Sequence, residues 1–282
     1  MADRRLGAYG LIPVGGPLQP EWWNDAPDDW MEWEVRWSPL DDADTAAIEE
    51  VPDKVVLRHQ PDGFAVIERG RRRTTLHLKK PLSAEGLVHP YLGSTVVAVA
   101  WWQGWRVLHA ASVAIDGGVW ALLGEREQGK SSTTAWLAAN RVAVFSDDVL
   151  VLRDGAALAG PRALDLRQPA HEHFAMGRSI GVVGTRERWR HRLDPVEPVL
   201  PFAGWVVLEW GQRVAVEAVP VAERFAWLQA AVARPSAPDP VAWLDMVARV
   251  PMIRFVRPRR WESLDGAMAT LLEVIRGPRP GH

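Results

Sequence analysis

The chain has 282 residues, of which 48% are hydrophobic and none is cysteine. This length suits one large domain with an appendage, and the lack of cysteine excludes disulfides, thiolate metal sites and cysteine nucleophiles. A formal net charge of −2 argues against a nucleic acid as the main partner, since phosphate backbones need a surplus of Lys and Arg. No apolar run has the length or flanks of a signal peptide or a membrane span, so we expect a cytoplasmic protein without a membrane partner.

Residues 1–95 predict a small β-rich N-terminal domain. Runs of β-branched or alternating residues, separated by turn-forming residues such as Pro61–Gly63, predict a small antiparallel sheet. The basic run Arg71–Arg73, like Arg257–Arg260 near the other end of the chain, is interpreted as a solvated turn. The four predicted strands lie around Trp33, Val56, Val66 and Leu76.

Residues 96–282 predict an α/β domain. The apolar stretch from Ser94 to Gly104 is a buried helix or strand, which periodicity alone cannot separate. Next come a strand over residues 106–115, a turn, a second strand, a loop, a helix over residues 130–140 and two further strands. Later patterns predict strands over residues 204–210, 213–219 and 251–258, and helices over residues 222–233, 240–250 and 261–276.

The loop of the central unit carries the most specific motif in the chain. The segment GEREQGKS, from Gly124 to Ser131, fits the P-loop pattern G-x-x-x-x-G-K-[ST] and lies between an apolar strand and a helix. In a P-loop, backbone N–H groups and the helix N-terminus hold the phosphates, the lysine binds the β and γ oxygens, and the hydroxyl binds Mg²⁺. The expected residues for binding ATP and Mg²⁺ are Gly124, Glu125, Arg126, Glu127, Gln128, Gly129, Lys130, Ser131 and Ser132.

Two glutamates in this loop do not suit a polyanionic ligand. The side chains of Glu125 and Glu127 must point away from the phosphates, and Arg126 can offset part of the repulsion. Variable positions in such loops are often glycine or serine because the backbone needs positive φ there. The loop therefore fits either a site where catalysis is slow or a site that only binds nucleotide.

Two adjacent aspartates follow the next predicted strand. Asp147 and Asp148 come directly after the apolar run Val142–Phe145 and Ser146, at a distance from Lys130 that suits one helix and one strand. Adjacent side chains in an extended segment point to opposite faces. One carboxylate can therefore serve Mg²⁺ while the other acts as general base on a substrate hydroxyl. The sequence does not decide which aspartate has which role.

These motifs together resemble the catalytic domain of HPr kinase/phosphorylase, a P-loop serine kinase of the phosphoenolpyruvate-carboxykinase-like type. The resemblance rests on the order and spacing of HAASVAIDG, LLGEREQGKSS, FSDDVLVL and GPRALDLR, within about a fifth of the chain. It is stronger to the shorter HPr-kinase-like proteins of peptide-modifying gene clusters, such as those of lasso peptides, which phosphorylate a serine of a precursor peptide. The N-terminal half does not resemble HPr kinase/phosphorylase, so HPr is not the expected acceptor.

The resemblance implies roles for individual residues. His109 matches a histidine that would orient the aspartate pair, and Asp165 takes the place of a metal-binding glutamate. The family also has an arginine that stabilises the transferring phosphoryl group, for which Arg186, Arg188 and Arg190 are candidates and Arg190 is preferred. The implied catalytic residues are Asp147, Asp148, His109, Lys130 and Arg190, and the implied metal ligands are Ser131, Asp148 and Asp165.

The leading hypothesis is an ATP- and Mg²⁺-dependent kinase that phosphorylates a serine in a peptide or small protein. The alternatives are a nucleotide-binding regulatory or carrier module without transferase activity, and a kinase for a small molecule. The three aspartates favour a kinase, because a protein that only binds nucleotide could dispense with them. HPr kinases assemble as ring hexamers, so a homo-oligomer is a further expectation from the resemblance. The sequence itself shows no interface for it.

Overall fold

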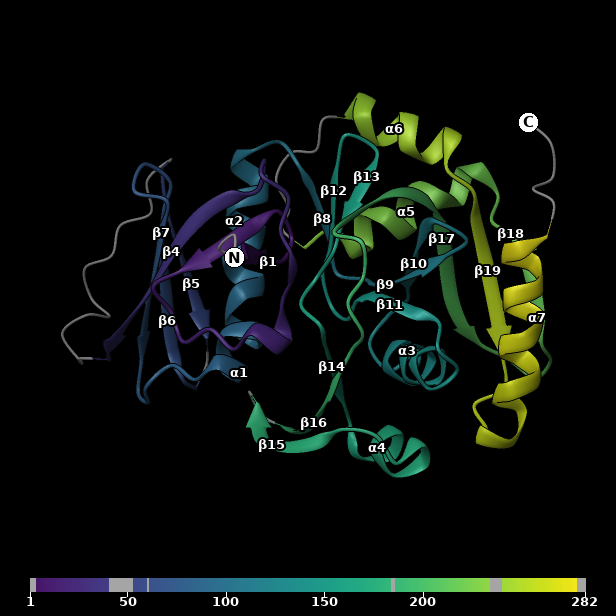
Figure 1. The fold of residues 1–282 in the computed structure, drawn as a ribbon. Helices are drawn as coiled ribbons and strands as arrows, with labels where there is room; N and C mark the ends of the chain where they lie inside the picture. The colour runs from purple at the N-terminus through teal and green to yellow at the C-terminus, as the bar shows by residue number, and fades with distance from the viewer. Residues whose placement is uncertain (1–3, 41–52, 60, 184–185, 234–239, 278–282) are drawn as a thin grey trace.

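The computed structural model describes residues 4–40, 53–59, 61–183, 186–233 and 240–277. Within them the chain forms a mixed α/β structure with several sheets (Figure 1). A five-stranded sheet forms in the N-terminal part, and a nine-stranded sheet and a three-stranded sheet form in the later part. No described helix is both long enough and apolar enough to cross a membrane.

The N-terminal sheet has the strand order β2-β4-β7-β6-β5. The four strands predicted here are present, but the prediction of an antiparallel sheet is wrong, because β4 pairs in parallel with both β2 and β7. Parallel pairing depends on long connections between strands, and the pattern within a strand does not reveal it. The strands are β2 (Leu11–Val14), β4 (Met31–Pro39), β5 (Lys54–His59), β6 (Gly63–Glu68) and β7 (Arg73–Leu78).

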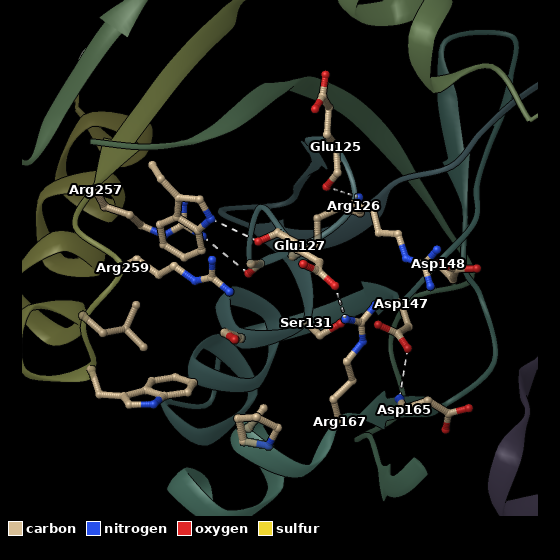
Figure 2. A pocket seen from close by; sticks show the side chains of 18 of the residues that line it. Glu125, Arg126, Glu127, Ser131, Asp147, Asp148, Asp165, Arg167, Arg257 and Arg259 are labelled. Carbon is tan, nitrogen blue, oxygen red and sulfur yellow. Dashed lines mark hydrogen bonds and ion pairs between the residues drawn. The ribbon is translucent and has the colours of Figure 1, made fainter. Parts of the chain in front are cut away.

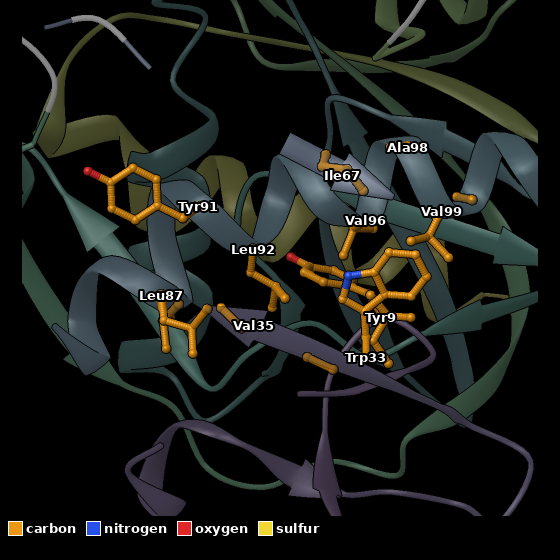
Figure 3. Packing of buried hydrophobic residues seen from close by; sticks show 14 of the residues in the cluster. Tyr9, Trp33, Val35, Ile67, Leu87, Tyr91, Leu92, Val96, Ala98 and Val99 are labelled. Atoms are coloured by element: carbon orange, nitrogen blue, oxygen red, sulfur yellow. The ribbon is translucent and has the colours of Figure 1, made fainter. Parts of the chain in front are cut away.

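Helix α2 (Leu92–Trp102) packs on the N-terminal sheet, so the ambiguous apolar stretch is a helix. Val96 of α2 belongs to the same buried cluster as Trp33 and Ile67 of the sheet (Figure 3). Val151 of the nine-stranded sheet is part of that cluster too. The helix therefore contacts both parts of the protein, which explains why its sequence is apolar on every side.

The larger sheet has the order β11-β9-β10-β17-β13-β12-β8, with β19 beside β17 and β18 beside β19. Its bounds are β8 (Arg106–Leu108), β9 (Ala111–Ile115), β10 (Gly118–Leu123), β11 (Ala143–Ser146), β12 (Leu150–Arg153), β13 (Ala156–Leu158), β17 (Val199–Trp210), β18 (Ala215–Ala218) and β19 (Met252–Arg257). The strand predicted over residues 106–115 is divided into β8 and β9. The other strands predicted in this region are present.

Helices cover both faces of the larger sheet. Trp120 and Leu122 of β10 share a buried cluster with α3 and α7, whereas Val119 and Ala121 share another with α5 and α6. All six residues of β10 are buried, as expected for a strand in a sheet covered on both faces. The helices are α3 (Lys130–Ala139), α5 (Val221–Ala231), α6 (Pro240–Arg249) and α7 (Leu264–Arg276).

A smaller sheet of order β14-β16-β15 lies below α3 in the view of Figure 1. It consists of β14 (Ala163–Leu166), β15 (Arg178–Val183) and β16 (Arg186–Arg192), and helix α4 (Gln168–Phe174) lies between β14 and β15 in the chain. The sequence patterns do not predict this sheet. It brings Asp165 on β14 opposite Arg190 on β16.

The two parts of the chain are also joined by buried polar contacts. Asn24, which is 1% exposed, donates a hydrogen bond to the carbonyl of Gly160 at 2.9 Å and accepts one from the N–H of Val196 at 3.1 Å. The Tyr9 N–H donates to the carbonyl of Ala159 at 2.7 Å. A boundary between residues 95 and 96, as predicted for two domains, would fall inside α2.

Substitution Asn24→Ala should lower the free energy of unfolding by about 2 to 3 kcal/mol, because it leaves a buried carbonyl and a buried N–H without partners. Urea denaturation measures this loss. Asn140→Ala is the matched control, since exposed Asn140 makes one bond at the end of α3, and a change below about 0.5 kcal/mol is expected. Equal stability of the two variants would show that the Asn24 contacts do not hold the two parts together.

Candidate functional site

The loop between β10 and α3 has a backbone that only glycine accommodates at its last position. Gly129, the residue before α3, has φ of +79°. A Cβ atom there would lie 2.6 Å from Nη2 of Arg257 and 2.8 Å from the Trp210 ring. The first N–H groups of α3 have no partner within the helix and carry its positive dipole end. The loop and helix therefore form an arrangement suited to an anion.

Lys130 lies over this loop. Its Nζ donates to the carbonyl of Gly124 at 2.6 Å and more weakly to that of Glu125 at 3.4 Å. Burial lowers the pKa of Lys130, and the nearby carboxylate of Asp148 acts in the opposite direction. The ammonium group is thus held inside the cavity wall by backbone carbonyls, which phosphate oxygens could replace.

The two loop glutamates differ in orientation. In Figure 2 the side chain of Glu125 points away from Ser131 and from the aspartates. Oε1 of Glu127 instead lies 3.5 Å from Nη1 of Arg167 and 3.8 Å from Nη1 of Arg186. The charge of Glu127 is therefore offset by two arginines, and the repulsion of an anion expected from the sequence is reduced.

Arg257, at the end of β19, supports the loop from behind. It is 1% exposed, and its Nη2 donates to the carbonyl of Gln128 at 3.0 Å and to Oγ1 of Thr133 at 3.0 Å. Its guanidinium lies 4.3 Å from the ring centre of Trp210, whose Nε1 donates to the carbonyl of Glu127 at 3.0 Å. Burial lowers the pKa of Arg257 to about 10, so the group stays charged at neutral pH.

The interpretation of the run from Arg257 as a solvated turn is therefore wrong for Arg257 itself. Arg259 and Arg260 also line the cavity. The physical reason is the parallel pairing of β17 with β19, which places Arg257 opposite Trp210. The sequence did place both residues at or near the ends of predicted apolar strands. The pairing of those strands, which buries Arg257, was not predictable from their composition.

The two aspartates have different surroundings. Oδ2 of Asp147 accepts a hydrogen bond from the N–H of Asp165 at 2.9 Å. Burial, with the neighbouring carboxylates of Asp165 and Asp148, raises the pKa of Asp147 to about 8. Asp148 is half-exposed, and its Oδ1 lies 3.3 Å from Nδ1 of His109. The structure thus brings His109 to Asp148 and keeps Asp147 on the inner side.

Arg190 lies elsewhere than the resemblance implies. It is 1% exposed and binds both carboxylate oxygens of Asp165, at 2.6 Å and 2.7 Å, and the carbonyl of Glu85 at 2.7 Å. Arg188, two residues earlier on β16, lines the cavity, and its buried Nε has no hydrogen-bond partner among the described residues. Of the three candidate arginines, Arg188 is therefore the one that lines the cavity.

These groups line one cavity of about 470 Å³, a size typical of small-ligand sites (Figure 2). Pro169, Ala170, Trp261 and Leu264 give it an apolar part. Of the expected residues, Gly124, Gln128 and Arg190 are not in the lining. The cavity brings together the expected residues Glu125, Arg126, Glu127, Gly129, Lys130, Ser131, Ser132, His109, Asp147, Asp148 and Asp165 with Arg188, one of the three candidate arginines. It adds His89, Arg167, Trp210, Arg257, Arg259 and Arg260.

A metal ion would need ligands from the nucleotide as well as from the protein. Within the described part of the chain, no group of three or more His, Asp or Glu side chains is arranged to hold a metal ion. Mg²⁺ in phosphate-binding sites commonly uses one or two carboxylates together with phosphate oxygens and water. Ser131, Asp147 and Asp148 in the cavity wall fit that kind of site.

Comparison with known proteins gives little guidance. No protein-family model and no curated protein matches the chain. Among solved structures, it is similar to the Hpr(Ser) kinase/phosphatase from Coxiella burnetii, with 11% identity and a TM-score of 0.33 over 61% of this chain and 90% of that chain.

The raised pKa of Asp147 predicts a pH-dependent stability in the metal-free protein. A carboxyl with an ordinary pKa of 3.8 when unfolded and about 8 when folded stabilises the fold fully below about pH 4. This stabilisation is lost as the pH rises towards 8, by at most about 1.4 kcal/mol per pH unit. Asp147→Asn removes this titration, so the variant should gain stability relative to the original protein between pH 5 and pH 8.

Urea denaturation in EDTA at several pH values measures this difference. Asp154→Asn is the control, because Asp154 is exposed in a turn, and its stability should follow that of the unchanged protein at every pH. Parallel curves for the unchanged protein and Asp147→Asn would contradict the raised pKa.

Proposed function

We propose that this protein is an ATP- and Mg²⁺-dependent kinase that transfers the γ-phosphoryl group to a serine hydroxyl in a peptide or small protein. The observation that carries the proposal is the meeting, in one cavity, of an anion-suited loop with Lys130 and the pair Asp147 and Asp148. The loop and lysine suit a triphosphate. The aspartates beside them suit the metal and the general base of phosphoryl transfer.

Several features of the wall fit a nucleotide. A Cβ atom at position 129 would collide with Arg257 and Trp210. Glycine there therefore lets the backbone pack closely at the start of α3. Arg188 and Arg257 both line the cavity, and guanidinium groups bind phosphate oxygens well. The apolar part around Pro169 and Trp261 suits the nucleobase.

The residues that would hold Mg²⁺ are Ser131 and Asp147, which leaves Asp148 for proton transfer. The ion, when bound, neutralises charge on the β- and γ-phosphates. Asp165 already binds Arg190 through both oxygens. Its role in the proposal is to position Asp147 through its N–H, rather than to bind the metal directly.

Asp148 is the proposed general base. It is half-exposed and lies beside His109, which orients its carboxylate. The serine oxygen forms a bond to the γ-phosphorus while the bond from that phosphorus to the β–γ bridging oxygen breaks. The hydroxyl proton passes to Asp148, and ADP leaves with the bonding electrons. Arg188 offsets charge on the transferring group.

Substitution Lys130→Ala should weaken binding of Mg-ATP by at least about a hundredfold, a loss of about 2.7 kcal/mol, because it removes the cation over the loop. Isothermal titration calorimetry measures the affinity. Lys79→Ala is the matched control, since Lys79 is exposed on the N-terminal part. If Lys130→Ala binds Mg-ATP with an affinity within a few-fold of that of the unchanged protein, the assignment of this loop as the nucleotide site is wrong.

Substitution Asp148→Asn should keep the affinity for Mg-ATP within a few-fold and lower the rate of transfer by at least about a hundredfold, the range for loss of a general base. Mass spectrometry of serine peptides incubated with Mg-ATP follows the gain of one phosphate. Full transfer by the variant would remove Asp148 as the base. Tight ATP binding by the unchanged protein without any transfer would favour the nucleotide-binding module.

A further inference from the structure

A second cavity, of about 610 Å³, adjoins the first. Five residues line both cavities, so the carboxylates lie where the two spaces meet. The remaining wall comes from Tyr9, from β5, from α2 with the segment before it, and from β14 with the loop before it. Residues that precede β12 and residues that follow α5 complete it. The shared residues are His89, His109, Asp147, Asp148 and Asp165.

The two cavities differ in charge. Seven cationic side chains line the first: Arg126, Lys130, Arg167, Arg188, Arg257, Arg259 and Arg260. Among the residues that the structure describes, no lysine or arginine lines the second, and most of its described wall is apolar. A triphosphate would lose its hydration there without finding a cation, so an uncharged group fits the second cavity better. The apolar wall includes Leu57, Val88, Pro90, Val97, Val149 and Val232.

The few polar groups of the second cavity, apart from the shared residues, are mostly satisfied within the protein. Nε2 of His59 lies 3.1 Å from Oγ of Ser94, whose hydroxyl donates to the carbonyl of Tyr91 at 2.8 Å. Burial lowers the pKa of His59, which favours the neutral ring at pH 7. The shared carboxylates, His109 and the hydroxyl of Tyr9 are therefore among the groups positioned to contact a hydroxyl entering this cavity.

A strand edge borders the cavity. β5 lies at the end of the N-terminal sheet, and among the described strands it pairs with β6 alone. Its residues Leu57 and His59 line the cavity. An edge strand can pair its backbone groups with those of an extended peptide, while side-chain pockets select the residues of that peptide.

We propose that the second cavity, here called the acceptor cavity, binds an extended peptide with a serine hydroxyl at Asp148 and uncharged apolar residues on both sides. The proposal rests on the proposed kinase function, which places the phosphoryl donor in the first cavity. Acidic neighbours of the serine are unfavourable, because Asp147, Asp148 and Asp165 already lie at the junction. The serine oxygen gains the γ-phosphoryl group, its proton passes to Asp148, and ADP leaves.

Gly93 gives a way to fill the acceptor cavity. It lies in α2 and lines the cavity, and a Cβ atom there would be 3.7 Å from Cγ2 of Val149, an ordinary contact. Gly93→Leu should therefore fill part of the cavity without straining the helix, because leucine has a higher helix propensity than glycine. Gly266→Leu in α7 is the matched control, since Gly266 is exposed and nothing lies within 4 Å of a Cβ there.

The test measures phosphate transfer from Mg-ATP to two peptides, each with one serine, flanked by valine and leucine or by aspartate. We expect the apolar peptide to be phosphorylated with at least tenfold higher kcat/KM than the acidic one. Gly93→Leu should raise the KM of the apolar peptide at least tenfold and leave the affinity for Mg-ATP unchanged. Gly266→Leu should behave as the unchanged protein. Leu57→Glu, on another part of the wall, should also lower kcat/KM at least tenfold.

The outcomes separate this proposal from the kinase function. Equal use of both peptides, or an unchanged KM in both Gly93→Leu and Leu57→Glu, would overturn the acceptor cavity. Transfer to glycerol or free serine, with neither peptide phosphorylated, would leave a kinase but refute the peptide acceptor. Bound ATP without transfer to any of these hydroxyls would refute the kinase function and this proposal together.

Discussion

The loop between β10 and α3 owes its shape to the buried guanidinium of Arg257. Burying a charge is costly unless it is paired or hydrogen-bonded, and here the carbonyl of Gln128, the hydroxyl of Thr133 and the face of Trp210 offset that cost. The same contacts leave room only for glycine at position 129. Two further nitrogens of Arg257 are buried without a partner in the described part of the chain.

A second buried arginine sets the arrangement of the carboxylates. Arg190 holds Asp165 through two hydrogen bonds, and the N–H of Asp165 in turn holds Asp147. Asp147 is thereby fixed on the inner side with a raised pKa, and Asp148 is left half-exposed beside His109. Neighbouring residues of one short segment thus have distinct environments. That difference supports the proposed division between metal binding and proton transfer.

The sequence predicted what depends on contiguous patterns. The strand, loop and helix around Lys130 follow from apolar runs broken by glycines. The sequence did not predict that Arg190 would bind Asp165 or that Arg257 would be buried. Both depend on which strands pair, and pairing joins segments far apart in the chain. The acceptor cavity was unpredictable for the same reason, since Leu57, Gly93 and Asp148 meet only after folding.

The proposed function requires the loop around Lys130 to hold the phosphates of a nucleotide beside the aspartate pair. A crystal structure with Mg²⁺ and a non-hydrolysable ATP analogue would locate both the phosphates and the metal. We expect the triphosphate at the start of α3, with Lys130 moved from the carbonyl of Gly124 to phosphate oxygens and the metal near Ser131 and the aspartates. An analogue bound elsewhere, with Lys130 still bonded to Gly124, would contradict it.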